Sequence, residues 1–196
     1  MLRRLFYFFI LSKKIISKPR KKKILIFDSD DSERILKYFK KKSVEILDFR
    51  MAYEAGQKLN LYVLFLILAK FKLSMKSYFE EYIRIVDPKA IITLTDNYPI
   101  FYSLKMNSDK TKKIIIQKSF RTLMPQDVLS KIKMLKKNKN NYCDFLLMFN
   151  FEIGKIFKSF LRGKVVPIGS FKSNSHPKFK GKKKIDILYI STFRKI

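Results

Sequence analysis

The chain has 196 residues, 47% hydrophobic and 15% aromatic, which suits one domain with a sizeable core and excludes a disordered chain. Its 44 Lys and Arg against 16 Asp and Glu give a formal net charge of +28. The one cysteine, Cys143, excludes an internal disulfide and fits a reducing compartment.

The positive charge has two interpretations. It can attract nucleic acid or an anionic membrane surface. It can also follow from composition alone, because Lys dominates over Arg, and Lys, Ile, Phe and Asn are all abundant, as expected for an AT-rich genome. Since the lysines occur all along the chain, the compositional interpretation is favoured, and nucleic acid is not expected as a partner.

Residues 1–22 form a basic and apolar N-terminal extension. Its apolar run, Leu5 to Leu11, is about a third of the roughly 20 residues that span a bilayer. Lys13 and Lys14 follow where a signal peptide has a small-residue cleavage site. The extension is therefore expected either to lie as a helix in a membrane interface or to be a short segment that packs on the domain or stays loose.

Strand and helix patterns alternate from residue 23 to residue 170, which predicts a Rossmann-like α/β domain with a parallel sheet flanked by helices. The predicted strands are Ile24–Phe27, Val44–Phe49, Ala90–Thr95, Lys113–Gln117, Phe145–Phe149 and Val165–Ile168. The predicted helices cover 30–39, 61–71, 75–86, 99–104, 127–137 and the segment after Asn150. The first helix is expected to start in a capping box of Asp30 and Glu33, and the helix over 61–71 is apolar all round and predicted to be buried.

The remaining segments predict a linker and the start of a second domain. Residues 171–184 are polar and basic and contain Pro177 and Gly181, as expected of a linker. Residues 185–196 begin with Ile185–Ser191, which is predicted to be the first strand of another α/β unit. On this interpretation the chain ends just inside a second domain.

Ligands of open parallel sheets bind beyond the carboxyl ends of the strands, so the polar residues there are the first candidates for a site. No Walker loop, GxGxxG or metal-spaced Cys/His cluster is present, and the lone His176 falls in the predicted linker. The segment IFDSDDS approximates the DxDx[T/S] motif of haloacid dehalogenase-like phosphatases, with Asp28 as nucleophile and Asp30 as general acid. That family also needs an acidic pair after a late strand to hold its metal ion, and no such pair follows Phe149. A strand-to-helix turn with acidic residues at the helix N-terminus is therefore favoured.

A second resemblance covers about residues 23–191. The segments TLTDNYPIFYSL, IIIQKSFR, MFNFEIGKIFKSFLRGKVVPIGSFKSN and DILYIS are similar in order and spacing to bacterial surface-carbohydrate (capsule-type) biosynthesis proteins. These are transferases of two-domain glycosyltransferase B-type (GT-B) architecture. The most specific parts are Asp96-Asn97 and the run from Gly163 to Asn174. The similar proteins have Gln-Asn-Gly where this chain has Gln117-Lys118-Ser119, and the missing glycine argues against an intact acceptor loop.

The resemblance implies that this chain is the acceptor-side half of a GT-B enzyme. The implied general base is Asp96 or Glu152. The implied substrate-binding residues are Asn97, Gln117, Arg121, Asn150, Gly169 and Ser170, with Arg121 contacting a phosphate or carboxylate. Asp, Gln and Asn residues at strand ends can equally well serve as caps of the helices that follow.

The resemblance also sets the expected partners and location. A carbohydrate or lipid-linked acceptor is the expected partner, with an anionic membrane surface as a further one. A nucleotide sugar is the donor implied for the full-length protein, whereas this part is expected to hold no cofactor or metal and to be inactive alone. The expected location is the cytoplasm, with peripheral attachment to the inner face of the plasma membrane left open. The alternatives are a basic module that binds nucleic acid or membranes, and the phosphatase.

Overall fold

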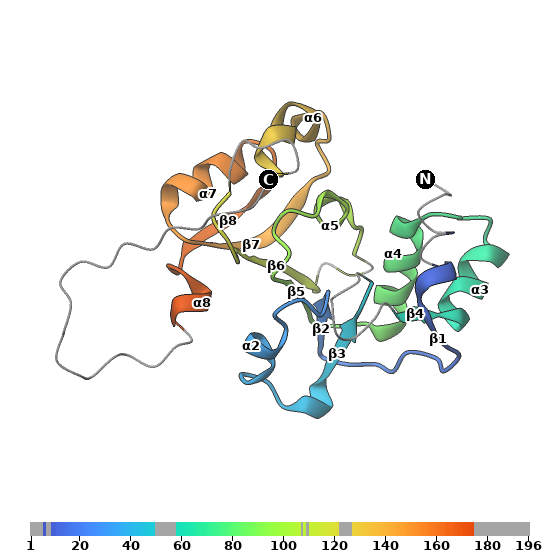
Figure 1. The fold of residues 1–196 in the computed structure, drawn as a ribbon. Coiled ribbons are helices and arrows are strands. Elements are labelled where there is room, and N and C mark those ends of the chain that lie inside the picture. Colours follow the sequence, from blue (N-terminus) through green and yellow to red (C-terminus); the bar gives the residue numbers. More distant parts are fainter. Residues whose placement is uncertain are drawn as a thin grey trace, which may run out of the picture.

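The computed structural model of the chain describes residues 6, 9–49, 58–106, 108, 110–121 and 127–174 (Figure 1). The predicted strand over 185–191 and His176 lie outside these ranges. The described strands are β1 (Lys13–Ile15), β2 (Ile24–Phe27), β3 (Val44–Leu47), β4 (Lys58–Asn60), β5 (Ala90–Thr93), β6 (Lys112–Ile116), β7 (Tyr142–Met148) and β8 (Arg162–Pro167). The described helices are α2 (Glu33–Leu36), η1 (Lys41–Ser43), α3 (Leu61–Ala69), α4 (Met75–Val86), α5 (Pro99–Ser103), η2 (Leu129–Lys131), α6 (Ile132–Lys136), α7 (Phe151–Lys158) and α8 (Phe171–Asn174).

The main sheet has six parallel strands in the order β3-β2-β5-β6-β7-β8. This confirms the predicted α/β class with a parallel sheet flanked by helices, consistent with a Rossmann-like fold. Strand β3, which follows β2 in the chain, pairs with one side of β2, and the later strand β5 pairs with its other side. The carboxyl ends of β2 and β5 therefore form the topological switch point, where ligands bind in open α/β sheets.

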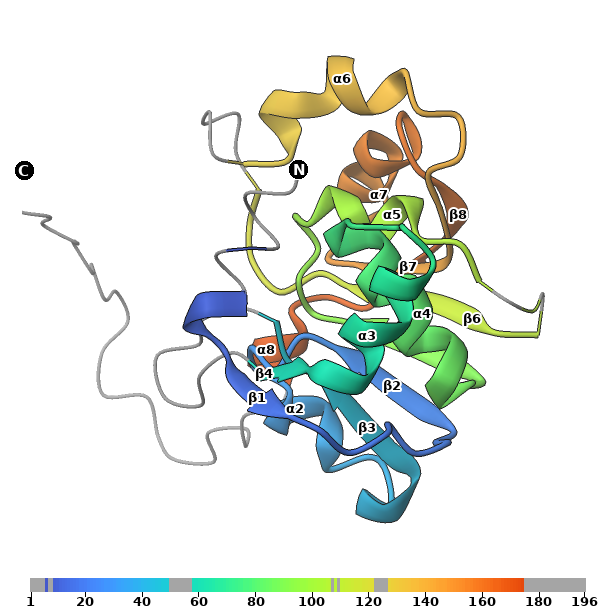
Figure 2. The ribbon, with the colours of Figure 1, turned by 90° about the vertical axis from the view of Figure 1, so that its right-hand side faces the viewer.

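The two faces of the sheet have unequal cover (Figures 1 and 2). Strand residues alternate between the faces, so that Leu25 and Phe27 of β2 join the larger core and Ile26 joins the smaller one. Helices α3 to α7 pack on the larger core, which extends under most of the sheet. The smaller core receives Ile35 of α2 and the half-buried Phe171 of α8.

An aromatic cluster supports the carboxyl ends of β2 and β3 from the side of the larger core. The Phe27 ring lies 4.8 Å from that of Phe49, 5.0 Å from that of Phe79 and 5.0 Å from that of Phe101. Tyr98 joins the cluster through Phe49, at 5.0 Å between ring centres. Because all these rings except Tyr98 are buried, the loops that follow β2 and β5 rest on a rigid apolar base.

Part of the N-terminal extension contacts the domain. Strand β1 pairs in parallel with β4 in a separate two-stranded sheet. The side chain of Asn60 donates to the carbonyl of Ser17 at 2.8 Å and accepts from the Val63 N–H at 3.1 Å. Asn60 thus caps α3, as predicted, and also ties the extension to it.

Three helix predictions need correction. Helix α2 is a single turn whose N-cap position is Ser32 and not Asp30, so Glu33 is its first residue and the predicted capping box of Asp30 and Glu33 does not start it. Helix α3 is buried on one side only, because Phe65 is 67% exposed. In α7, Phe151 and Ile156, which the apolar pattern after Asn150 places on the inner side of the helix, are exposed. The first four residues of the predicted linker form α8.

Candidate functional site

The switch point is held together by hydrogen bonds between the ends of β2 and β5. Asp28, the residue after β2, is buried and has a left-handed backbone with φ 93°. Its Oδ2 accepts a hydrogen bond from the Thr95 hydroxyl at 2.8 Å, and the Thr93 hydroxyl donates to the Phe27 carbonyl at 2.9 Å. A non-glycine residue in this backbone region costs about 1–2 kcal/mol, and such strain concentrates at functional sites.

Asp96, one of the two predicted general bases, forms an ion pair with the predicted substrate residue Arg121. The Arg121 Nε donates to Asp96 Oδ2 at 2.8 Å, and a terminal guanidinium nitrogen of Arg121 donates to Oδ1. Asp96 is fully buried, and the Tyr102 hydroxyl donates to its backbone carbonyl. Burial raises the pKa of the Asp96 carboxyl, while the adjacent guanidinium lowers it. Since Asp96 is fully buried, a substrate can reach its carboxylate only after neighbouring groups such as Arg121 move.

Gln117 joins the ends of β6 and β7. Its side-chain oxygen accepts from the Phe149 N–H at 2.9 Å, and its amide nitrogen donates to the Ser119 carbonyl at 3.1 Å. The residue is fully buried, so both ends of its carboxamide are used inside the protein. This position makes Gln117 a support for the edge of the sheet.

The other predicted residues lie at the ends of β5, β7 and β8. Asn150 caps α7 through its Oδ1, which accepts from the Ile153 N–H at 2.9 Å, and the Ser170 hydroxyl accepts from the Ser173 N–H at 3.2 Å. Gly169 has φ 67°, a left-handed conformation that suits glycine. Glu152, the other predicted base, pairs with Lys155 at 2.8 Å and its side chain is 76% exposed. Asn97 is half-buried beside Asp96 in the sequence.

Lys118 is a residue of this edge that the sequence analysis did not identify as part of a site. Its ammonium lies 2.8 Å from Asp30 Oδ2 and 2.5 Å from Asp31 Oδ2, so it joins the end of β6 to the turn after β2. Burial opposes the charged form of Asp31, but hydrogen bonds from Lys118 and Arg34 outweigh it, and the pKa of Asp31 is lowered. The signal was present in the sequence, because Lys118 follows a strand end directly.

Asp48 is a second residue of this edge that the sequence pattern did not identify as part of a site. Asp48, after β3, is buried and accepts a hydrogen bond from the Ser29 hydroxyl at 2.7 Å. Burial raises the pKa of Asp48 above its ordinary value, and the charge of Asp28 raises it further. The described ranges hold no group of three His, Cys, Asp or Glu side chains placed to bind a metal ion.

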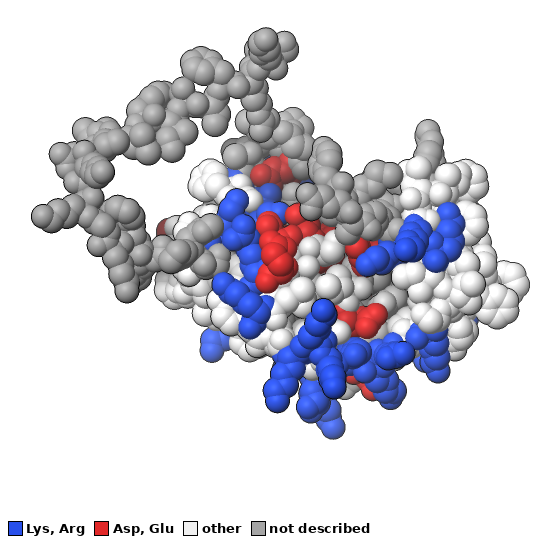
Figure 3. Space-filling model, turned by 60° about the horizontal axis from the view of Figure 1, so that its bottom comes forward, with Lys and Arg blue, Asp and Glu red and all other residues white. Residues whose placement is uncertain are grey.

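Taken together, the ends of β2, β5 and β6 present paired charges that can exchange partners with a polar ligand. Asp30 and Lys118 are partly exposed, with 42% and 26% of their side-chain surface accessible. On the face drawn in Figure 3, Lys and Arg side chains lie at the lower margin and on both sides of a group of Asp and Glu. This face is therefore mixed in charge, not uniformly basic.

Residues 114–196 match the model of a family described as "putative O-antigen biosynthesis protein". The match relates this part of the chain to surface-polysaccharide biosynthesis. It begins within β6 and includes β7, α7, β8 and α8, and hence Gln117, Arg121, Asn150 and Ser170. No curated protein and no solved structure gives a significant match. Among the described residues, none of the helices has the length and apolar character needed to cross a membrane.

Proposed function

We propose that this chain is the acceptor-side part of a glycosyl- or related transferase that builds O-antigen or another surface polysaccharide. The observation that carries the proposal is the family match over residues 114–196. The matched part supplies Arg121 and Lys118, which pair with Asp96 and Asp30 outside it. The polar edge is thus built jointly by the matched segment and by the first half of the sheet.

The finer assignment is a two-domain GT-B enzyme whose second domain binds a nucleotide sugar. A parallel α/β sheet with its polar residues at the carboxyl ends of the strands suits the first domain of such an enzyme. In this proposal the acceptor lies across the ends of β2, β5 and β6, where Asn97, Asp30 and Lys118 are partly exposed.

The ion pair of Asp96 and Arg121 suggests how an acceptor would engage. A phosphate or carboxylate on the acceptor would compete for Arg121, because a guanidinium binds either group through two parallel hydrogen bonds. Displacement of Arg121 would release a carboxylate oxygen of Asp96 to accept a hydroxyl proton. Glu152 is the alternative base, and its exposed side chain needs no such displacement.

Attachment to a membrane surface is the proposed location, and exposed apolar side chains support it. Phe65 of α3 and Phe71 just after it are 67% and 93% exposed. Strand β1 packs beside α3, and Leu11 and Ile16 on either side of β1 are exposed as well. Lys14 and Lys72 are close to these side chains in the sequence and could reach anionic head groups.

Deletion of the gene tests the proposal. The expected result is loss or shortening of one surface polysaccharide on a gel, with restoration by the wild-type gene. Extraction of lipid-linked intermediates from the same cells should show one precursor accumulating, whose structure identifies the acceptor. Cells whose surface polysaccharides and precursors are all unchanged by the deletion would refute the proposal.

A further inference from the structure

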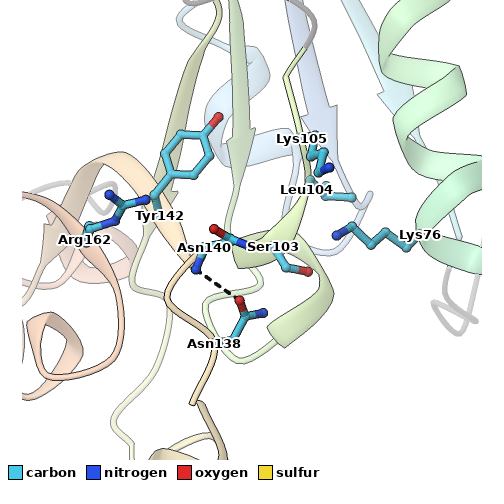
Figure 4. A pocket seen from close by; sticks show the side chains of 8 residues that line it. All are labelled: Lys76, Ser103, Leu104, Lys105, Asn138, Asn140, Tyr142 and Arg162. Atoms are coloured by element: carbon cyan, nitrogen blue, oxygen red, sulfur yellow. Dashed lines mark hydrogen bonds between the residues drawn. The ribbon is translucent and has the colours of Figure 1, made fainter. Parts of the chain in front are cut away.

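A cavity of about 370 Å³ lies at the amino-terminal ends of β7 and β8, on the opposite edge of the sheet from the site described above. Its lining contains three cationic residues, Lys76, Lys105 and Arg162, and no acidic residue. The other lining residues are Ser103, Leu104, Asn138, Asn140 and Tyr142. Figure 4 shows Arg162 and Lys76 on opposite sides of the cavity, with Asn140 and Ser103 between them.

The strands and the loop before β7 place these groups. Tyr142 and Arg162 are register partners, next to an irregularity in the pairing of β7 with β8. Gly163 allows this close approach, because a Cβ at that position would lie 2.1 Å from the Cys143 carbonyl oxygen. In the loop, the Asn140 N–H donates to Asn138 Oδ1 at 3.1 Å, a turn that leaves both carboxamides beside the cavity (Figure 4).

A neighbouring cavity also has basic side chains in its lining, but acidic side chains accompany them, so basic residues alone do not indicate an anion site. That cavity, of about 270 Å³, is lined by Lys70, Lys72, Arg84 and Lys105, but also by Glu80 and Glu81. Glu81 lies 2.9 Å from Lys70 and 2.5 Å from Arg84, so these cations are neutralised within the protein.

Of the three cations that line the first cavity, Lys76 has an acidic partner within the described ranges, the carboxylate of Glu80. Glu80 is 3.7 Å from Lys76, and its Oε1 accepts the backbone N–H of Lys105 at 2.9 Å. The side chains of Lys105 and Arg162 make no ion pair within the described part of the chain.

A buried lysine adds positive charge behind the wall of the cavity. The Lys113 ammonium donates to the carbonyls of Tyr102 and Leu104 at 2.9 and 3.1 Å, and lies 4.1 Å from the centre of the Tyr142 ring. Burial is the main cause that lowers the pKa of Lys113 to about 8, and repulsion from Lys76 lowers it as well. A bound anion would offset this repulsion, since opposite charge favours the protonated form.

We infer that this cavity binds the phosphate group of a small polar molecule, such as a sugar phosphate. A phosphate ester offers three acceptor oxygens and about two negative charges. Arg162 provides a fork of donors, the lysines provide point charges, and the two carboxamides provide neutral donors, whereas the Ser103 hydroxyl already donates to the Ile100 carbonyl at 3.1 Å. The inference does not depend on the proposed transferase function, because the cavity lies at the other edge of the sheet.

Isothermal titration of the full chain with glucose 1-phosphate at low salt tests the inference. Saturable binding is expected, and the variant Lys105→Ala/Arg162→Ala should bind about tenfold more weakly or worse. The matched control Lys41→Ala/Lys42→Ala removes the same formal charge from the exposed turn η1, and Lys72→Ala alters the neighbouring cavity. Both should bind within twofold of wild type, and thermal melts should confirm that all variants are folded.

Three outcomes would overturn the inference. One is the absence of saturable binding to the wild-type protein. Another is an equal loss in the Lys41/Lys42 control, which would trace binding to the net charge of the whole surface. The third is equally tight binding of glucuronate, which would show that the cavity does not select a phosphate group over a carboxylate.

Discussion

At the scale of single residues, Asp96 and Lys113 are two of several buried ionisable side chains, and the protein accommodates them in different ways. Asp96 is paired directly with Arg121, whereas Lys113 is surrounded by two carbonyls and the rings of Phe101 and Tyr142. A buried charge without an ionic partner shifts its pKa toward the neutral form. The contribution of Asp96 to stability therefore depends on its partner Arg121, and the contribution of Lys113 depends on pH.

Lys113 should make the stability of the protein rise with pH. Its pKa in the folded chain is about 8, against an ordinary 10.5, so the unfolded chain binds more protons between these values. The free energy of unfolding should therefore increase from pH 8 to pH 10.5 by roughly 3 kcal/mol relative to Lys113→Met, which cannot titrate. Urea unfolding of both proteins across this range measures the difference. Parallel pH profiles would contradict the assignment.

Removal of Arg121 should be strongly destabilising, because it leaves the Asp96 carboxylate buried without a partner. We expect Arg121→Ala to lower the free energy of unfolding at pH 7 by about 3–5 kcal/mol. The double variant Asp96→Asn/Arg121→Ala should recover part of the loss, since a neutral amide costs less to bury. Chemical denaturation gives both values. A double variant less stable than the single one would show that the pair does not act as described.

At the scale of secondary structure, the strands were predictable and several helix details were not. The six strands of the main sheet contain short apolar runs, most of them followed by a polar residue, a pattern read directly from sequence. Strands β1 and β4 were missed because three-residue segments such as KKI and KLN carry no periodic signal. Helix α2 begins at Glu33, later than expected, and Asp30 instead pairs with Lys118, a contact between segments 88 residues apart in the sequence.

The candidate site was predictable only in part, for the same reason. Strand-end residues such as Asp96, Gln117 and Asn150 can be found from the pattern, since the carboxyl edge is where ligands bind. The contacts among them depend on how the loops fold back, and no local pattern encodes the pairing of Asp96 with Arg121. Lys118 directly follows Gln117 at the end of β6, and its role emerges only from its distance to Asp30 and Asp31.

Asn150 tests whether a predicted site residue is chiefly a helix cap. Asn150→Ala should lower the free energy of unfolding by about 1 kcal/mol through loss of the bond to the Ile153 N–H. Asn150→Asp should stay within a few tenths of a kcal/mol, because Asp caps equally well. Thermal denaturation separates the two. If Asn150→Asp loses as much stability as Asn150→Ala, the residue has a role other than the cap.

The exposed face of α3 gives the membrane proposal its own test. Phe65→Ser/Phe71→Ser should bind anionic phospholipid vesicles at least tenfold more weakly than wild type, because two large apolar side chains no longer enter the interface. Tyr38→Ser/Met134→Ser removes exposed apolar side chains elsewhere and should bind as wild type does. Co-sedimentation with vesicles measures both. Equal binding by all three proteins would leave charge as the sole attraction and refute a role for α3.

At the scale of the whole molecule, two opposite edges of one sheet carry different chemistry. The carboxyl edge holds mutually paired acids and bases, and the amino edge holds a cavity lined by cations without acids. The family match relates residues 114–196 to surface-polysaccharide biosynthesis, and the carboxyl edge is the site proposed for that function. The account therefore depends most on whether the carboxyl edge is needed for that work.

The most direct measurement is the surface polysaccharide of cells that lack the gene and carry a variant of it. Asp30→Asn/Asn97→Ala changes the accessible part of the carboxyl edge, whereas Lys41→Ala changes an exposed turn at a distance from it. With equal amounts of folded protein, Lys41→Ala should restore the polysaccharide as wild type does, and the edge variant should not. Full restoration by the edge variant would contradict the account.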